Sequence, residues 1–411
     1  MTAPFRADPL ASPRTEQEAL AALAEIAPGI AARAADEEPS AETFAELRRA
    51  GLTLFALPRT YGGSGATLPQ AASVIRALAA ADASVALVLT MHYIHGNWAV
   101  AGPAPSRPIR ELAAGGLVNL AGSEGVSGSP GRGGAVRTRA VPQPDGSWLI
   151  TGHKRYVTGS VFLDHLLISA TVQDGTAEIG AGRSGSSGSG DAESGGTTDK
   201  PVVRTFLVPA DAPGLRIDPT WNAFGLRGSA SHDVLLDEVR VPGDAVVEAY
   251  DAGLPEGRRF GIWWALLLAS IHLGIAEAAR EVALDFAAGP RTDGQPGTRA
   301  EQPRTQEHAA RLELALTQAR VLLEDALRRG ATVADRTEAV AAAATKLLVH
   351  RHASDAVDHA CRLVGGASVW HESPLGRHFR DLRVALFNPP NEDVVIDLVA
   401  RSVLGLDEKR R

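Results

Sequence analysis

Cysteine, methionine and aromatic residues are all scarce in this sequence. Its 411 residues include one cysteine, Cys361, and two methionines, and aromatic residues make up only 5%. A single cysteine excludes an internal disulfide and a thiolate metal cluster, as is usual in a reducing compartment. Met1 to Asp8 has no basic segment leading into an apolar stretch, so no secretory signal is indicated. We therefore expect a cytoplasmic protein.

The sequence also lacks an excess of positive charge and a long apolar run. Lys and Arg number 41 against 48 Asp and Glu, for a net charge of -7, so nucleic-acid binding has no electrostatic support. The apolar run from Trp263 to Ile271 is too short to cross a bilayer before His272 interrupts it. We predict a buried core helix there, and neither a nucleic-acid nor a membrane partner.

Two patterns that can indicate a ligand lack the context they need. His352 and His359 share a helix face but would lie about 10 Å apart along the axis, too far to share a metal without other ligands, so we predict no metal site. Residues Gly180 to Gly185 match a dinucleotide fingerprint, but they fall in a Gly- and Ser-rich stretch, Gly175 to Asp199, with no strand before and no helix after. We expect that stretch to be a mobile surface loop without a nicotinamide site.

The chain divides into three regions by texture. Residues 1–118 have helical spacing of Ala and Leu, residues 119–243 have short apolar runs separated by turns, and residues 244–411 return to long helical stripes. The predicted architecture is α+β: an all-helical N-terminal domain, a middle β-barrel or sandwich domain, and a C-terminal four-helix bundle.

Five short motifs, in order, resemble the acyl-CoA dehydrogenase superfamily of flavoenzymes. They are Tyr61-Gly62-Gly63-Ser64-Gly65, Leu120-Ala121-Gly122-Ser123-Glu124, Gly152-His153-Lys154-Arg155-Tyr156-Val157-Thr158-Gly159-Ser160, Phe224-Gly225-Leu226-Arg227-Gly228-Ser229, and Pro374-Leu375-Gly376-Arg377-His378-Phe379-Arg380-Asp381. The resemblance spans most of the chain. It implies the same order of helices, strands and helices, and assembly into a dimer or tetramer through the C-terminal bundle.

The resemblance also implies a bound flavin. A flavin ring needs hydrogen bonds along its polar edge and apolar contacts on its faces. At the positions that match the flavin segments, the sequence supplies Ser123, Ser129, Tyr156, Thr158, Gly159 and Ser160.

The segment that grips the adenine half of FAD in relatives departs from their pattern. No Phe-Gly pair occurs in Gly289 to Gly297, and Arg362 stands where relatives have a Gln before the Gly365-Gly366 pair. Because a cation suits a phosphate, we predict FMN, bound with help from Arg362, Gly365 and Gly366, with FAD as the alternative.

Neither position that carries the catalytic Glu of relatives is acidic here. Alignment with their motifs places Pro389 at one position and Trp264 at the other. A general base contributes about two to four orders of magnitude to proton abstraction, so its loss argues against ordinary dehydrogenation. Glu392, three residues away, is the candidate for a relocated base; an exposed Glu in the first turn of a helix is the structural alternative.

Histidines match a different branch of the superfamily, the two-component flavin monooxygenases that include dibenzothiophene-type and N-oxygenating enzymes. His92 and His378 stand where that branch carries active-site histidines, and Ser160 matches the residue near flavin N5. Imidazoles could stabilise a flavin C4a-hydroperoxide. A dry wall would be formed by Trp98, Trp263 and Trp264.

We therefore favour an oxygen-dependent monooxygenase that uses FMN reduced by a separate flavin reductase and acts on a small, partly aromatic or apolar molecule. Two alternatives remain: an acyl-CoA dehydrogenase or oxidase with a relocated base, and a flavin-free binding scaffold, since a fold alone does not guarantee catalysis.

Overall fold

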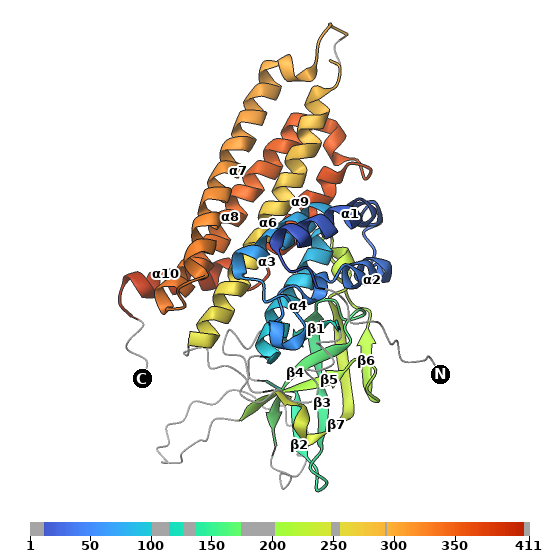
Figure 1. Ribbon diagram of the computed structural model, residues 1–411. Helices are drawn as coiled ribbons and strands as arrows, with labels where there is room; N and C mark the ends of the chain where they lie inside the picture. Colours follow the sequence, from blue (N-terminus) through green and yellow to red (C-terminus); the bar gives the residue numbers. More distant parts are fainter. Residues whose placement is uncertain are drawn as a thin grey trace, which may run out of the picture.

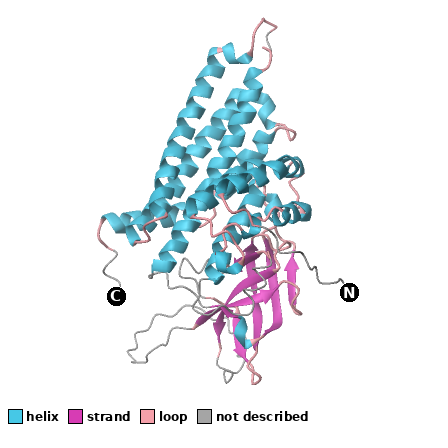
Figure 2. Cartoon of the chain, viewed as in Figure 1, coloured by secondary structure: helices cyan, strands magenta, loops and turns pink. Residues whose placement is uncertain are grey.

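The computed structural model describes residues 12–100, 115–125, 136–173, 202–247, 255–291 and 294–406. Ser129 and the stretch Gly175 to Asp199, both singled out from the sequence, lie outside these ranges. Helices come first, then strands, then long helices, so the predicted α+β order is confirmed (Figures 1 and 2).

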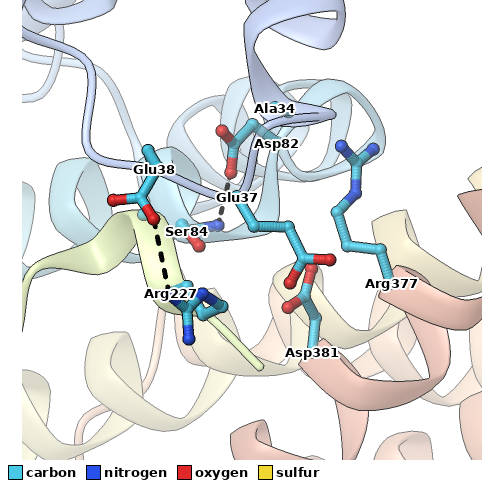
Figure 3. A pocket seen from close by; sticks show the side chains of 9 residues that line it. Ala34, Glu37, Glu38, Asp82, Ser84, Arg227, Arg377 and Asp381 are labelled. Carbon is cyan, nitrogen blue, oxygen red and sulfur yellow. Dashed lines mark hydrogen bonds and ion pairs between the residues drawn. The ribbon is translucent and has the colours of Figure 1, made fainter. Parts of the chain in front are cut away.

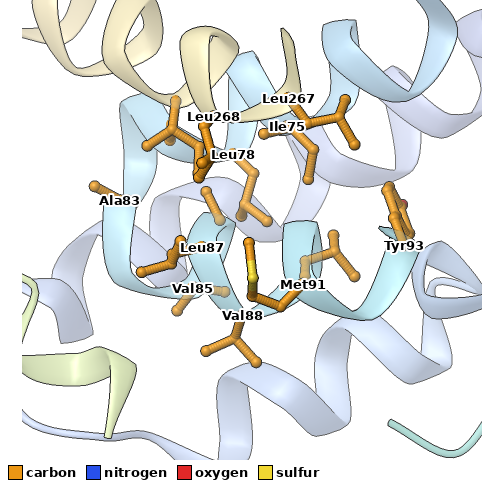
Figure 4. Close-up of a cluster of buried hydrophobic side chains, with 14 of the residues drawn as sticks. Ile75, Leu78, Ala83, Val85, Leu87, Val88, Met91, Tyr93, Leu267 and Leu268 are labelled. Carbon is orange, nitrogen blue, oxygen red and sulfur yellow. The ribbon is translucent and has the colours of Figure 1, made fainter. Parts of the chain in front are cut away.

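Four helices form the described N-terminal region. Asp82 starts the last of them, because its carboxylate accepts the backbone N–H groups of Ser84 (2.7 Å) and Val85 (3.2 Å). That helix is apolar around its whole circumference and is buried against the third N-terminal helix and the C-terminal bundle (Figure 4). The helices are α1 (Glu16–Ala34), α2 (Ala41–Arg49), α3 (Leu68–Ala81) and α4 (Ala83–Val100).

The described strands form one sheet of eight strands, where the sequence left barrel and sandwich open. Its order is β6-β7-β3-β2-β4-β5-β8, with β1 pairing in parallel with β4. Inward-facing apolar residues such as Ile150, Ile168 and Phe206 are fully buried and belong to the main hydrophobic core. The strands are β1 (Val118–Ala121), β2 (Arg139–Pro142), β3 (Trp148–Val157), β4 (His165–Val172), β5 (Val203–Pro209), β6 (Leu215–Asp218), β7 (His232–Val241) and β8 (Val246–Val247).

Three long helices dominate the C-terminal region: α6 (Pro255–Ala288), α7 (Pro303–Gly330) and α8 (Arg336–Val364). In place of a fourth long helix, the described chain has α9 (Pro374–Ala385), which packs on α6 and α8, and α10 (Glu392–Val403), which packs on α8. The helix breaks there because Pro389 and Pro390 cannot continue it. The predicted four-helix bundle is thus three long helices and a broken fourth.

Helix α6 is long and apolar enough to cross a membrane, but 78% of its most apolar window is buried inside the protein. It packs against α3, α4, α7, α8 and α9. The structure therefore agrees with the sequence interpretation of this run as a core helix.

Candidate active site

Three segments that are far apart in the sequence meet at the end of β3. The Arg155 N–H donates to the Ser123 carbonyl (2.9 Å), and the Gly159 N–H donates to the Ser229 carbonyl (2.8 Å). The Ser231 hydroxyl donates to the hydroxyl of Thr158 (3.1 Å). The two predicted flavin segments and the loop between β6 and β7 therefore lie side by side, held by hydrogen bonds.

A buried ion pair joins the first two of these segments. Lys154 Nζ lies 2.6 Å from Glu124 Oε1 and also donates to the Ser169 carbonyl (2.7 Å). Burial raises the pKa of Glu124, but hydrogen bonds from Lys154 and Thr138 more than offset it and keep the pKa below its ordinary value. Sequence reasoning noted both residues only as parts of motifs, because their pairing depends on the register of β3.

Tyr156 stands out from the sheet beside this junction. It lies at a register shift between β3 and β7, has a φ of 57°, and leaves 58% of its surface exposed. Its ring meets the edge of Trp221 at 6.4 Å between centroids. A bulky residue in the left-handed region is strained, and such strain at a bulge often turns a side chain toward a ligand. This exposed aromatic surface suits a flat ring such as a flavin.

The hydroxyl groups predicted for the flavin edge are present but partly engaged. Ser160 is buried, and its hydroxyl donates to the Ala230 carbonyl (2.8 Å). Thr158 accepts from Ser231, and its own carbonyl accepts from the Asn119 side chain (2.8 Å). Gly159 has a φ of 76° and approaches Val88, so a side chain there would be strained and would collide with α4. The sheet segment is therefore fitted closely against the helix that carries His92 and His95.

The loop after β6 is docked on α9. The Leu226 N–H donates to an oxygen of Asp381 (2.6 Å), and a Cβ on Gly225 would lie 2.4 Å from the Arg380 carbonyl oxygen. Asp381 also lines a small polar cavity, together with Asp82 and Arg377 (Figure 3). Burial raises the pKa of Asp381 to about 7. This cavity joins the N-terminal helices, the β6–β7 loop and α9.

An aromatic wall lies where α4 meets α6. The His95 ring contacts the rings of Trp264 (5.3 Å between centroids), Phe260 (5.7 Å) and Trp98 (6.3 Å). Phe260 in turn contacts Trp98 and Trp264. We call these four residues, His95, Trp98, Phe260 and Trp264, the aromatic wall.

His95 is the polar member of the aromatic wall. Its Nδ1 donates to the Met91 carbonyl (2.9 Å), which places the proton on Nδ1. Its buried Nε2 makes no hydrogen bond of normal geometry among the described residues, and the neighbouring donor is the Asn119 side-chain amide, which also bonds to the carbonyl of Thr158. Burial lowers the pKa of His95 to about 3. The ring is thus a neutral imidazole whose Nε2 is available as a hydrogen-bond acceptor.

The two positions that the motifs predict for a catalytic Glu, Trp264 and Pro389, come together in space. The indole N–H of Trp264, in α6, donates to the carbonyl of Pro389, in the loop between α9 and α10. Glu392, the candidate for a relocated base, is at the start of α10 with its carboxylate 2.5 Å from Arg351 Nη2 and its side chain 43% exposed. This surface ion pair matches the structural alternative considered from the sequence.

His92 and His378, the histidines chosen from the sequence, are both buried. His92 Nε2 donates to the Thr53 carbonyl (2.8 Å), and Nδ1 accepts the Val118 N–H (3.1 Å), so the main chain uses both ring nitrogens. Burial lowers the pKa of His92 to about 4 and that of His378 to about 3. His378 is in α9, and none of the ring contacts found among the described residues joins it to the aromatic wall.

The remaining predicted site residues are spread over the C-terminal region. Arg362, near the end of α8, is exposed and pairs with Asp358 (2.6 Å). Gly365, with a φ of 72°, and Gly366 follow it, and open space surrounds the Cβ position of each. Trp263 is half-buried and packs against the main core beside Trp264.

Sequence reasoning missed His95. It and His92 are three residues apart on α4, and His92 was preferred by its place in the motif. One signal was available in the sequence. On a helix, His95 and Trp98 are three residues apart and share a face, so His95 lies on the same side as a tryptophan predicted for the site. Trp264, also predicted for the site, is on another apolar run.

Comparisons with known proteins match both helical regions of the chain to one family. Residues 17–104 match the acyl-CoA dehydrogenase N-terminal domain, and residues 263–404 match its C-terminal domain. YdbM of Bacillus subtilis (strain 168), which is assigned to the acyl-CoA dehydrogenases, is 31% identical over 88% of this chain and 88% of its own. The L-evernosamine nitrososynthase of a Micromonospora species is 28% identical over 94% of this chain and 89% of its own.

Among solved structures, the complex of TdsC from Paenibacillus sp. A11-2 with FMN and indole superposes with a TM-score of 0.79, at 21% identity, over 95% of this chain and 98% of TdsC. At that identity the likeness shows the fold alone. Together with the match to YdbM, it agrees with the fold and the oxidoreductase class expected from the sequence. The chain belongs to the acyl-CoA dehydrogenase family.

Proposed function

We propose that the protein is an oxygen-dependent flavin monooxygenase. The proposal rests on the motif alignment, which predicts Trp264 and Pro389 at the two positions of the family's catalytic base, and on the observed hydrogen bond between them. Neither group can take a proton from a substrate carbon. The ring of His95, a neutral imidazole, contacts the ring of Trp264.

The residues at the end of β3 fit a flavin. The exposed ring of Tyr156 offers an apolar face, and Thr158, Ser160 and Ser123 bring hydroxyl groups to one junction. A bound reduced flavin would supply the electrons that activate oxygen. We propose FMN rather than FAD, because Gly289 to Gly297 lacks the Phe-Gly pair of FAD-binding relatives. Mass spectrometry of the released flavin tests this, and stoichiometric FAD would refute it.

Within this site we propose His95 as the hydrogen-bonding catalytic residue. Its Nε2 can accept a hydrogen bond from an oxygen-bound or substrate hydrogen, while the surrounding rings keep water out. His92, whose nitrogens are used by the main chain, would position α4. His378 and Ser160 stay candidates for contact with the ligand.

The aromatic wall favours a flat, apolar or heteroaromatic substrate. Trp98, Phe260 and Trp264 offer ring faces and edges for stacking, and their rings contact one another and the neutral ring of His95. The relatives include a protein named for an amino sugar and one solved with indole, so both chemistries serve as probes.

The decisive experiment supplies FMN, NADH, a separate flavin reductase and ¹⁸O₂, with indole as the first probe. Incorporation of one ¹⁸O atom into indole, dependent on this protein, is the expected result. A panel of apolar aromatics and amino-sugar nucleotides that yields only hydrogen peroxide would refute monooxygenation.

The likeness to YdbM favours acyl-CoA dehydrogenation as the second candidate. Anaerobic bleaching of the bound flavin by an acyl-CoA would support it. A preparation that stays colourless after flavin is added would support a flavin-free scaffold instead.

We also propose a homodimer or homotetramer formed through the C-terminal helices. Exposed apolar side chains in this region can become buried when a second copy binds, and light scattering that gives a monomer mass would exclude such assembly. These side chains are Leu314, Val321, Val369, Trp370, Ile396 and Val403.

A further inference from the structure

Lys346 is buried beside the loop between α9 and α10, whose Pro389 carbonyl accepts the indole N–H of Trp264. It lies in α8, is only 3% exposed, and its Nζ donates to the carbonyls of Asn388 and Pro390, the latter at 3.0 Å. Both partners are main-chain carbonyls and neither is a carboxylate. Burial lowers the pKa of Lys346 to about 7.

Helix packing alone does not account for a lysine at this position. Removing an ammonium group from water costs several kcal/mol, and an apolar side chain would fill the same space without that cost. The hydrogen bonds that Lys346 makes all go to the loop between α9 and α10. Lys346 therefore acts on the conformation of that loop.

The loop between α9 and α10 has few backbone N–H groups with which to anchor its own turn. Pro389 and Pro390 have no backbone N–H, so neither can donate a hydrogen bond that would anchor the turn. Three consecutive carbonyls, those of Asn388, Pro389 and Pro390, instead accept from side chains of two different helices. The outer two accept from Lys346 of α8 and the middle one accepts from Trp264 of α6.

We propose that Lys346 is a positioning residue for the aromatic wall. By holding the carbonyls of Asn388 and Pro390, it presents the Pro389 carbonyl to the indole N–H and so fixes the Trp264 ring against His95. The effect on oxygenation rests on the proposed function, whereas the effect on Trp264 itself does not.

The test uses the full-length protein labelled with 5-fluorotryptophan and free of flavin. The ¹⁹F resonance of Trp264 is assigned as the one lost in Trp264→Phe. We expect Lys346→Met to shift or split that resonance while those of the other tryptophans stay in place. Arg351→Gln is the matched control, because it breaks an exposed ion pair of the same helix to the start of α10. An unchanged Trp264 resonance in a folded Lys346→Met protein would overturn the proposal.

Should Lys346→Met fail to fold, Lys346→Gln replaces it. The shorter Gln amide can reach at most one of the two carbonyls, so we expect a smaller shift of the Trp264 resonance in the same direction. An unchanged Trp264 resonance in folded Lys346→Gln would also overturn the proposal.

In turnover with reductase and indole, Lys346→Met should raise the hydrogen peroxide released per NADH at least fivefold. Adding Trp264→Phe should raise it little further, because both act on one contact. Independent, additive effects would overturn the inference, whereas no oxygenation by the unmodified protein would refute only the proposed function.

Discussion

The indole N–H of Trp264, in α6, donates a hydrogen bond to the main-chain carbonyl of Pro389, in the loop between α9 and α10. The sequence motifs predict that these are the two positions of the catalytic Glu in relatives. Neither an indole nor an imino acid can take a proton from a substrate carbon, which is why we propose a chemistry other than dehydrogenation.

From this contact we expect the flavin-loaded protein to keep its flavin oxidised when an acyl-CoA is added without oxygen. Glu392→Gln should change oxygenation less than about twofold, because that carboxylate is paired with Arg351 at the surface. Absorbance at the flavin band under anaerobic conditions measures the first effect. Bleaching that disappears in Glu392→Gln would identify a relocated base and contradict the monooxygenase proposal.

Replacement of His95 should abolish productive oxygen use. His95→Ala removes the imidazole acceptor of the aromatic wall, and we expect product per NADH to fall by about two orders of magnitude, with hydrogen peroxide rising in its place. Flavin affinity should stay within about twofold, because His95 is in α4, whereas the residues proposed to bind the flavin are at the end of β3.

His92→Gln gives the comparison within the same helix. It disrupts hydrogen bonds to Thr53 and Val118, so we expect a loss of about 1–3 kcal/mol in the free energy of unfolding, measured by denaturant titration. If His92→Gln abolishes coupling in a stable protein and His95→Ala does not, the roles assigned to the two residues are reversed.

The sequence was sufficient for the order of elements but not for the choice between these histidines. Apolar periodicity and turn residues predicted the strands around Ile150, Ile168 and Phe206, because local pattern and burial agree there. Both ring nitrogens of His92 bond to backbone groups of other elements, whereas His95 bonds to a carbonyl of its own helix. The contacts of His92 are set by Thr53 and Val118, which are distant in sequence, so no local pattern reports them. The Lys346 contact to the α9–α10 loop was hidden for the same reason.

The buried pair Glu124–Lys154 should be required for both folding and flavin binding. Lys154→Met leaves the Glu124 carboxylate buried without its cation, and we expect a loss of about 3–5 kcal/mol in the free energy of unfolding. The double variant Glu124→Gln with Lys154→Met should recover part of that loss, because no buried charge remains. A Lys154→Met protein as stable as the unmodified one would show that the pair does not hold the two segments together.

Acid should destabilise the C-terminal bundle through two histidines in mutual contact. The rings of His272 and His350 lie 4.8 Å apart between centroids. Burial lowers the pKa of His350 to about 4 and that of His272 well below its ordinary value. The cations of Lys346, Arg351 and Arg383 also face His350, and the carboxylate of Glu392 opposes them only in part.

The sign of the effect follows from these lowered pKa values. Between pH 6.5 and about 4 the unfolded chain binds a proton at His350 that the folded protein does not, so stability is lost as the pH falls through that window. The expected loss for His350 is about 3 kcal/mol. His350→Gln should therefore flatten the dependence of the unfolding free energy on pH, whereas His371→Gln, at an exposed position, should leave it unchanged. An equal slope in His350→Gln and the unmodified protein would mean that this imidazole is already protonated in the native bundle, with its charge compensated there.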